Sequence, residues 1–358
     1  MNTFRENTIK RITLKYWGEL FFLTQLILIL TCATCGGQPR TKAADLVVDN
    51  QLIDITSPRY TALFNELTTV HHFKRATLAT LFKNIRISRK VLVLMDRQWE
   101  ETPYYRYRPL FFTPLVITTG KEFLKSHAKL FDRIEKTYGV DREYIVAIWG
   151  IESKFGANQG SFNLFQTLNT LFDAYPRRSD FFRKELIHFL KLCRENSFDP
   201  LSITGSYAGA FGQAQFMPSS FNSYSVDFDG DNRRDLINSL PDIFASIAHY
   251  LKIFGWTLHS PVSAKIGTKL KSKVLIDAHN RGRKALLDWR LIAKTQGISI
   301  PRPPANKQLF IISLQDSSTS SDGVSYFAGY PNFKAITAYN HSNKYAMVVS
   351  ELAEAFKQ

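Results

Sequence analysis

Cysteine is scarce in this chain of 358 residues, and long apolar runs are absent. Only Cys32, Cys35 and Cys193 occur, too few for a disulfide framework that could replace a hydrophobic core. The apolar stretch at residues 20–30 is shorter than the roughly 20 residues that a membrane-spanning helix needs. A hydrophobic fraction of 44% and a charged fraction of 22% exclude wholesale disorder. We therefore expect a globular fold that depends on its own core.

Acidic residues are also few, because 31 Asp and Glu stand against 46 Lys and Arg, a net charge of +15. Such an excess suits an anionic partner: a cell-wall polymer, lipid head groups or nucleic acid. The excess is concentrated in residues 265–307, where eleven Lys and Arg face only Asp277 and Asp288. This segment is either a solvated basic face or a patch that meets a polymer or a membrane.

Metal-ligand spacing is missing among His188, His249, His259 and His341. We therefore predict no cofactor for catalysis. Cys193 lies in an apolar helical segment, where cysteine behaves as a small core residue.

The first 44 residues are predicted to be an export signal and tether. Four basic residues precede the apolar stretch at residues 20–30, and small residues follow it, which is typical of a signal peptide. Cys32 and Cys35 come just after the apolar stretch, as in bacterial lipoproteins. Two outcomes stay open, a lipidated cysteine or an uncleaved N-terminal anchor. We expect an exported, periplasmic protein, with an outer-membrane lipoprotein as one form, and the export signal argues against a nucleic-acid partner.

The rest of the chain reads as mainly α, in the α+β class. Residues 45–125 are predicted as an N-terminal helical region, with a surface loop at 104–114. Residues 121–138 look like one amphipathic helix. The Val and Ile clusters, prolines and serines of residues 257–329 indicate a small basic module that contains strands. Residues 330–358 are predicted to end in a helix that returns to the core.

Glu152 stands out because it interrupts an almost wholly apolar helix. We place this helix between Asp141 as its N-cap and Gly156 as its stop. Trp149 and Phe155 are neighbours of Glu152 on the helix face. Burial among such side chains raises the pKa of a carboxyl group, as a general acid requires near neutral pH. The alternative is a carboxylate that pairs with a basic residue at the helix end.

Five motifs occur in an order that resembles the bacterial lytic murein transglycosylases of the B family, which have a lysozyme-like catalytic domain. They are Ile151–Gly156, Tyr175–Arg178, Gly205–Ser220, Asp227–Asp231 and Tyr339–Met347. The resemblance is dense over residues 95–256 and returns at residues 330–349. It implies a lysozyme-like catalytic core over residues 126–256, which includes an acidic loop of calcium type.

The resemblance also implies the reaction. The family cleaves the β-1,4 bond between N-acetylmuramic acid and N-acetylglucosamine without water, so peptidoglycan strands are the expected partner. Glu152 would act as general acid and then as general base, while the muramoyl C6 hydroxyl closes a 1,6-anhydro ring. No second carboxylate has a convincing place in the motifs, since Asp173, Glu185 and Glu195 are expected on helix surfaces. The alternatives are a lysozyme-type hydrolase and a non-catalytic wall-binding protein.

By the same match, six further residues are predicted to bind substrate. Gln215 and Ser206 would hold Glu152 or the N-acetyl arm of the sugar, unless they are a surface amide and a loop cap. The other four match positions of the substrate groove, where half-buried core is the alternative for the tyrosines. These four are Tyr250, Tyr339, Asn340 and Tyr345.

The acidic loop that starts at Asp227 has oxygen-bearing side chains at positions typical of a calcium loop. It departs from the pattern at Asn232, which replaces the turn glycine, and at Asn238, which replaces the closing glutamate. The loop holds either a structural Ca²⁺ or only solvated acids. The predicted ligands are Asp227, Asp229, Asp231, Arg233 and Asp242.

Overall fold

The computed structural model describes residues 42–97, 102–317 and 323–358. The predicted export signal, with Cys32 and Cys35, therefore lies outside the described residues. In the described ranges, no helix combines the length and the apolar character that crossing a membrane requires. Cys193 is a buried free thiol, as predicted.

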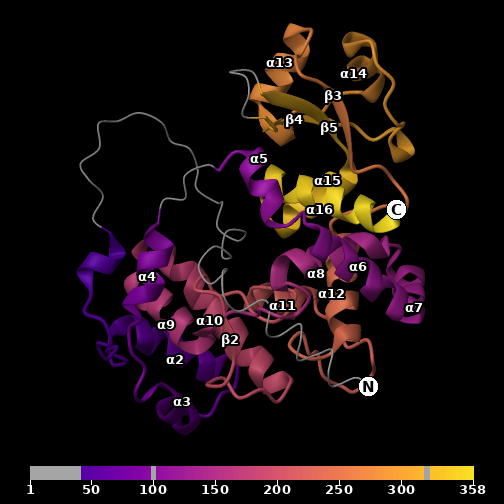
Figure 1. Ribbon diagram of the computed structural model, residues 1–358. Coiled ribbons are helices and arrows are strands. Elements are labelled where there is room, and N and C mark those ends of the chain that lie inside the picture. The colour runs from indigo at the N-terminus through magenta and orange to yellow at the C-terminus, as the bar shows by residue number, and fades with distance from the viewer. Residues whose placement is uncertain (1–41, 98–101, 318–322) are drawn as a thin grey trace, which may run out of the picture.

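The predicted mainly helical class is confirmed, and one group of helices forms a lobe at the lower left of Figure 1. In this lobe the N-terminal helices pack against the middle of the chain, because Tyr60 is buried and donates a hydrogen bond to Asn169 at 3.0 Å. The helices of this lobe are α2 (Pro58–Thr69), α3 (Arg75–Phe82), α4 (Arg89–Asp96), α9 (Leu164–Ala174) and α10 (Ser179–Glu195). Short 3₁₀ turns at Ala43–Leu46 and Pro176–Arg178 complete it.

The second group of helices surrounds α8 (Arg142–Ser153). Every residue of α8 from Tyr144 to Ser153 is buried, because an almost wholly apolar helix must be covered on all sides. The helices that contact it are α6 (Pro114–Ser126), α7 (Ala128–Tyr138), α12 (Leu240–Ile253) and α16 (Asn343–Lys357). Next to α12 lie α11 (Pro218–Tyr224) and α15 (Pro331–Tyr339).

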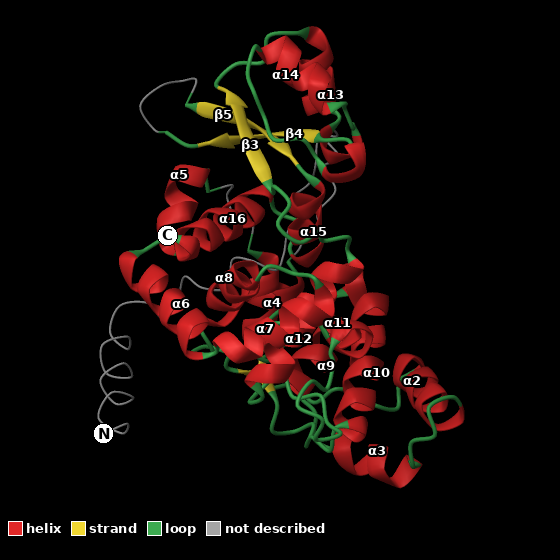
Figure 2. Ribbon diagram, turned by 90° about the vertical axis from the view of Figure 1, so that its right-hand side faces the viewer, coloured by secondary structure: helices red, strands yellow, loops and turns green. Residues whose placement is uncertain are grey.

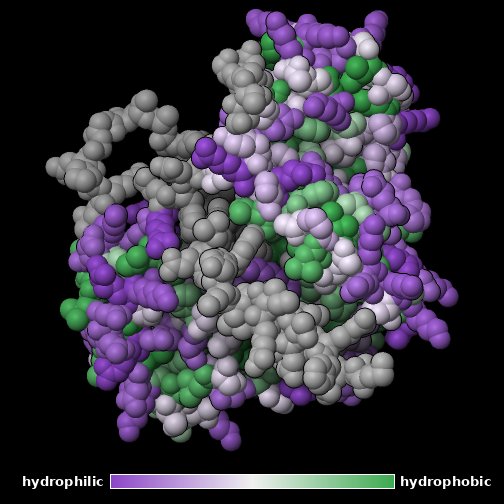
Figure 3. Space-filling model, in the orientation of Figure 1, coloured by the Kyte–Doolittle hydropathy of each residue, from purple (hydrophilic) through white to green (hydrophobic). Residues whose placement is uncertain are grey.

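The small C-terminal module is a three-stranded antiparallel sheet in the order β3–β5–β4, with Ile312 opposite Phe327. Its strands are β3 (Ser263–Gly267), β4 (Phe310–Gln315) and β5 (Val324–Gly329). In Figure 2 the sheet separates α13 (Lys273–Asn280) and α14 (Trp289–Gln296) from α15 and α16. On the face drawn in Figure 3, the outer end of this module carries many hydrophilic side chains with hydrophobic patches among them. Short 3₁₀ turns at Gly282–Lys284 and Pro304–Asn306 link its elements.

Strand β4 joins two hydrophobic cores. Phe310, Ile312 and Leu314 pack in the main core, which is shared with α8 and α16, whereas Ile311 packs in a separate core under α13 and α14. This follows from the alternation of side chains along a strand, which puts successive residues on opposite faces. The sheet is therefore the wall between the module and the helical core.

Two expectations for residues 104–138 are wrong. The predicted loop at 104–114 contains a helical turn, α5 (Tyr104–Tyr107), followed by a 3₁₀ turn at Arg108–Leu110. Tyr104, Tyr107 and Phe111 are buried. They recur at helical spacing because they pack together against the core, and the neighbouring prolines made this segment look like a loop in the sequence. The predicted single helix at 121–138 is divided between α6 and α7, because His127 has non-helical dihedral angles.

The ends of α8 also differ from expectation. Asp141 stands at the N-cap position, but its side chain does not cap the helix. Its carboxylate accepts hydrogen bonds from Trp256 and His259 instead. The helix ends at Ser153 rather than at Gly156, because Lys154 adopts a left-handed conformation with φ of 52°.

Glu185 was expected on a helix surface, and this is wrong. The residue is 2% exposed. Its two carboxylate oxygens accept hydrogen bonds from the backbone N–H of Ser219 at 2.8 Å and from its hydroxyl at 2.7 Å. Since α11 has no side-chain cap of its own, Glu185 caps it from α10. This contact holds the helix that directly follows the Gly205–Met217 loop.

We expect Glu185→Ala to lower the free energy of unfolding by about 1–3 kcal/mol, because two donors of the partly buried Ser219 lose their buried acceptor. Glu195→Ala, on the same helix, is the matched control. Glu195 forms a partly exposed ion pair with Arg234 at 2.8 Å, and such pairs contribute at most about 1 kcal/mol. Urea denaturation measures both changes, and equal losses for the two variants would contradict the capping role.

Candidate active site

Glu152 lies in the last turn of α8 and is 6% exposed. The hydroxyl of Tyr345, from the first turn of α16, donates a hydrogen bond to Oε1 of Glu152 at 2.7 Å. The start of α16 is held in turn by Ser342, whose side chain accepts from the backbone N–H of Tyr345. The carboxyl group is thus buried and has one oriented donor.

Burial raises the pKa of Glu152 to about 8, and the hydrogen bond from Tyr345 opposes that rise more weakly. Among the described residues, no charged side chain contributes to the shift. Burial also raises the pKa of Tyr345 well above its ordinary value, and the nearby charge of Glu152 adds to the effect. At neutral pH the pair is therefore a protonated carboxyl group next to a neutral phenol.

The helix that carries Glu152 is attached to the glycine-rich loop through a pair of buried side chains. The indole N–H of Trp149 donates to Oε1 of Gln213 at 2.8 Å, and Nε2 of Gln213 donates to the carbonyl of Ile237 at 2.8 Å. Gly156 passes so close to Gln213 that an added Cβ would lie 2.5 Å from its amide oxygen. With its φ of 83°, position 156 therefore requires glycine.

Ser206 and Gln215 lie in the loop that follows β2 (Thr204–Gly205), which pairs with β1 (Phe162–Asn163). Both are buried, so Gln215 is not a surface amide. The hydroxyl of Ser206 accepts from the backbone N–H of Ala210 at 3.0 Å, which makes it a loop cap. Gln215, in a left-handed conformation with φ of 49°, donates to the carbonyl of Gly212 at 2.8 Å. Both side chains keep the loop in its shape.

Tyr250 and Tyr339 form one aromatic cluster, with ring centroids 4.9 Å apart. The hydroxyl of Tyr339 donates to the carbonyl of Ala214 at 2.6 Å, which ties this cluster to the loop of Gln215. Burial raises the pKa of Tyr339 well above its ordinary value, and the charge of Glu152 adds to the rise, so this phenol lies near the buried acid.

Asn340, just after α15, has a buried side-chain amide whose nitrogen finds no hydrogen-bond partner among the described residues. An unpaired buried donor is costly, and a bound ligand is one group that can satisfy it.

Tyr107 is a site residue that the sequence analysis missed. It is buried on α5, and the charge of Glu152 contributes to its raised pKa, so its phenol also lies near the acid. The segment was assigned to a loop because prolines flank it. The spacing of Tyr104, Tyr107 and Phe111, three and four residues apart, is the signal that could have identified it.

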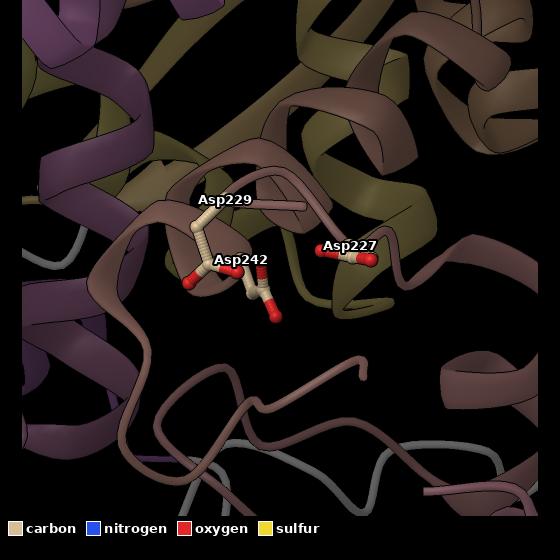
Figure 4. A group of neighbouring side chains, drawn as sticks. All are labelled: Asp227, Asp229 and Asp242. Atoms are coloured by element: carbon tan, nitrogen blue, oxygen red, sulfur yellow. The ribbon is translucent and has the colours of Figure 1, made fainter. Parts of the chain in front are cut away.

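The acidic loop brings three of its predicted ligands together. Carboxylate oxygens of Asp227, Asp229 and Asp242 lie within 4.8 Å of one another, and Figure 4 shows their side chains meeting between the loop and the start of α12. Asp242 is fully buried, and burial raises its pKa. Asp231 is not part of this group. Its carboxylate accepts from the backbone N–H of Arg233. The guanidinium of Arg233 donates to the carbonyl of Asn196.

The fold and site together define a mainly helical domain in which the buried carboxyl group of Glu152 lies among tyrosines, the class of protein suited to general acid–base catalysis. The chain belongs to the transglycosylase SLT domain family, whose model matches residues 57–354. It is 31% identical to the membrane-bound lytic murein transglycosylase B of Escherichia coli K12, over 93% of this chain and 97% of that protein.

Solved structures are similar too. The soluble lytic transglycosylase SltB1 of Pseudomonas aeruginosa matches with a TM-score of 0.76 and 36% identity, over 84% of this chain and 98% of that one. The lytic transglycosylase Slt35 of Escherichia coli, in complex with calcium, matches with a TM-score of 0.75 and 34% identity. That match covers 85% of this chain and 94% of the other.

We expect Tyr345→Phe to raise the pKa of Glu152 further, by on the order of half a unit to one unit, because the carboxylate loses its donor. The wild-type kcat/KM should fall as pH rises through about 8, where the acid loses its proton. In the variant this alkaline limb should move to higher pH. Tyr250→Phe is the control, since its hydroxyl donates to Ala338 and not to Glu152. An alkaline limb that is the same in all three proteins would contradict the assignment.

Proposed function

We propose that the chain is a peptidoglycan lytic transglycosylase that cleaves the β-1,4 bond between N-acetylmuramic acid and N-acetylglucosamine. Glu152 first donates its proton to the glycosidic oxygen, and the N-acetylglucosamine leaves as an alcohol. The resulting carboxylate then removes the proton of the muramoyl C6 hydroxyl, which bonds to C1 and closes a 1,6-anhydro ring. The proton is back on Glu152 at the end, and no water is consumed.

The observation that carries this proposal is the burial of Glu152, which is 6% exposed at the end of an apolar helix and accepts a hydrogen bond from the hydroxyl of Tyr345. A pKa of about 8 keeps the acid loaded at neutral pH, as the first step needs. A retaining hydrolase needs a second carboxylate about 5–5.5 Å away, and at that distance its charge would raise the pKa of Glu152 further. Among the described residues, no second carboxylate contributes a charge that raises the pKa of Glu152. This favours the one-acid reaction over the lysozyme-type hydrolysis.

The proposed substrate contacts are the groups around Glu152. Tyr345 orients the carboxyl group, and Asn340 offers its unpaired amide to the N-acetyl arm of a sugar. Ser206 and Gln215 keep the glycine-rich loop in shape. Tyr250 and Tyr339 supply aromatic faces to the sugar rings.

We expect Glu152→Gln to reduce cleavage of purified sacculi about 100-fold to 10,000-fold, because the amide can neither give nor take the proton. Mass analysis of the products made by the mature wild-type protein decides the reaction class. Transglycosylase products carry anhydro ends, lighter by one water molecule than the products of a hydrolase. Hydrated ends, or full turnover by a folded Glu152→Gln protein, would overturn the proposal. A wild-type protein that binds sacculi without any products would favour a non-catalytic wall-binding protein.

A second proposal is a structural Ca²⁺ at Asp227, Asp229 and Asp242. Three carboxylates this close repel one another, and an oxygen-seeking cation relieves that repulsion. The relative Slt35 is described with calcium, which supports the assignment. Asp231 and Arg233, predicted as ligands from the loop pattern, remain candidates for a wider coordination shell. The ion would hold the loop against α12 and take no part in catalysis.

If Ca²⁺ binds only the folded state, millimolar calcium should raise the Tm by a few degrees and a chelator should reverse the rise. Asp229→Ala should abolish the response. Asp180→Ala is the matched control, because Asp180 is an exposed acid in the first turn of α10, outside the acidic loop, and its variant should still respond. A Tm that ignores calcium in the wild-type protein would reject the site.

We also propose that the protein is exported and works in the periplasm, held at a membrane by its N-terminal segment. The basic, apolar and small-residue pattern of residues 1–44 supports export. The relative in Escherichia coli is described as membrane-bound, which supports the anchoring. A lipid on Cys32 or Cys35 is the proposed form of the anchor.

A further inference from the structure

The outer end of the C-terminal module exposes apolar side chains among its cations. We call residues 273–294 the module tip, which comprises α13, the turn at Gly282–Lys284 and most of α14. In the described ranges twelve large apolar side chains are exposed, and four of them belong to the tip. These four, each 40–52% exposed, are Val274, Ile276, Leu286 and Leu291. The active site described above does not use them.

The packing of α13 and α14 turns these side chains outward. Ile292 is fully buried and directs one face of α14 into the core that lies under both helices. Leu291 and Lys294, three residues apart, share the exposed face of α14. Lys273 and Ile276 have the same spacing on α13 and are also exposed. Figures 1 and 2 show both helices at one end of the molecule, across the sheet from α15 and α16.

The charge of the tip is not neutralised within the molecule. Among the described residues, only one exposed cation of the tip has an ion-pair partner, since Arg290 lies 3.5 Å from Asp288. Both members of that pair are exposed, so their attraction is weak. The only other acid of the tip is Asp277. The exposed cations are Lys273, Arg281, Lys284, Arg290 and Lys294. Their field is therefore available to an external anion.

Cations with apolar side chains between them match a surface that is anionic at its boundary and apolar just beneath it. An anionic polymer would neutralise Lys273 and Lys294 but would leave Ile276 and Leu291 in water. In a bilayer with anionic phospholipids, the head-group phosphates attract the cations, while the apolar side chains enter the boundary of the acyl chains. We propose that the module tip docks on the surface of an anionic phospholipid bilayer. This contact is additional to the N-terminal anchor and does not depend on the cleavage reaction.

Docking by the tip would orient the active site. The sheet of the module lies between the tip and the helices around α8, which carries Glu152 (Figures 1 and 2). A bilayer under the tip is therefore on the far side of the sheet from α8. Alternate residues of β4 pack in the core of the module and in the main core, so the two parts move together. An N-terminal anchor alone attaches the chain at one point and leaves this orientation open.

Binding to phospholipid vesicles tests the proposal. The chain from residue 42 onward is used, so that the apolar stretch at residues 20–30 cannot insert into a vesicle. The soluble relative SltB1 corresponds to this folded part, since 84% of the present chain covers 98% of it. Cosedimentation is compared for vesicles of phosphatidylcholine with and without about one quarter of phosphatidylglycerol. We expect binding only where phosphatidylglycerol is present, and weaker binding as salt rises.

Two double variants separate the contribution of charge from that of apolar contact. Lys273→Glu with Lys294→Glu should raise the Kd for the anionic vesicles at least tenfold, because the head groups then repel the tip. Ile276→Asn with Leu291→Asn should raise the Kd about fivefold to tenfold, because two apolar side chains no longer enter the lipid boundary.

Each double variant has a matched control outside the module. Lys125→Glu with Lys129→Glu makes the same change of charge at exposed lysines of α6 and α7. Leu115→Asn with Leu201→Asn removes two leucines that are at least as exposed as those of the tip. Both controls should bind the anionic vesicles like the parent chain. Tm values check that every variant is folded.

No binding of the parent chain to the anionic vesicles would overturn the inference, as would equal losses in the tip variants and their controls. A loss in the charge variant without a loss in the apolar variant would also overturn it, because the tip would then be a solvated basic face that attracts any polyanion. Release of anhydro products from soluble murein glycan tests the proposed function separately. Both tip variants should release these products at the parent rate, since the tip lies outside the active site.

Discussion

Removal of water from one carboxyl group is the constraint on which the rest of this structure depends. Glu152 ends an apolar helix that other helices cover on all sides, and burial rather than a neighbouring charge raises its pKa. The hydrogen bond from Tyr345 keeps the acid oriented without cancelling that shift. An exposed glutamate would be ionised at neutral pH and could not begin the proposed cycle. The covering helices are therefore as much a part of the chemistry as the acid itself.

The two ends of α8 have different tasks. Glu152 and the left-handed Lys154 mark the end at which the helix meets the glycine-rich loop. At the other end, the carboxylate of Asp141 accepts hydrogen bonds from Trp256 and His259, which begin the connection to the C-terminal module. Asp141, which the sequence predicts to be an N-cap, thus forms tertiary hydrogen bonds instead. The helix connects the reacting acid with the joint between core and module.

The sequence predicted the helical class, the buried helix of Glu152 and the buried position of Cys193, because strong apolar patterns and flanking signals specify them locally. It could not predict contacts that depend on distant partners. From sequence, Glu185 is predicted to be an exposed acid, because its hydrogen-bond partner Ser219 lies on another helix. Tyr107 sits between prolines that suggest a loop, and only its packing against the core makes it helical. The unpaired amide of Asn340 has no signature in sequence at all, since an absence of partners is a property of the folded state.

The C-terminal module is tied to the catalytic core through shared packing rather than through a linker alone. Alternate residues of β4 belong to the main core, and α16, which carries Tyr345, lies against the same strand. Strand β4 and helix α16, which are separate in sequence, therefore together hold the phenol of Tyr345 in place. Because Phe310 and Ile312 pack in the core while Ile311 packs in the module, the module cannot rotate freely without disturbing the support of α16.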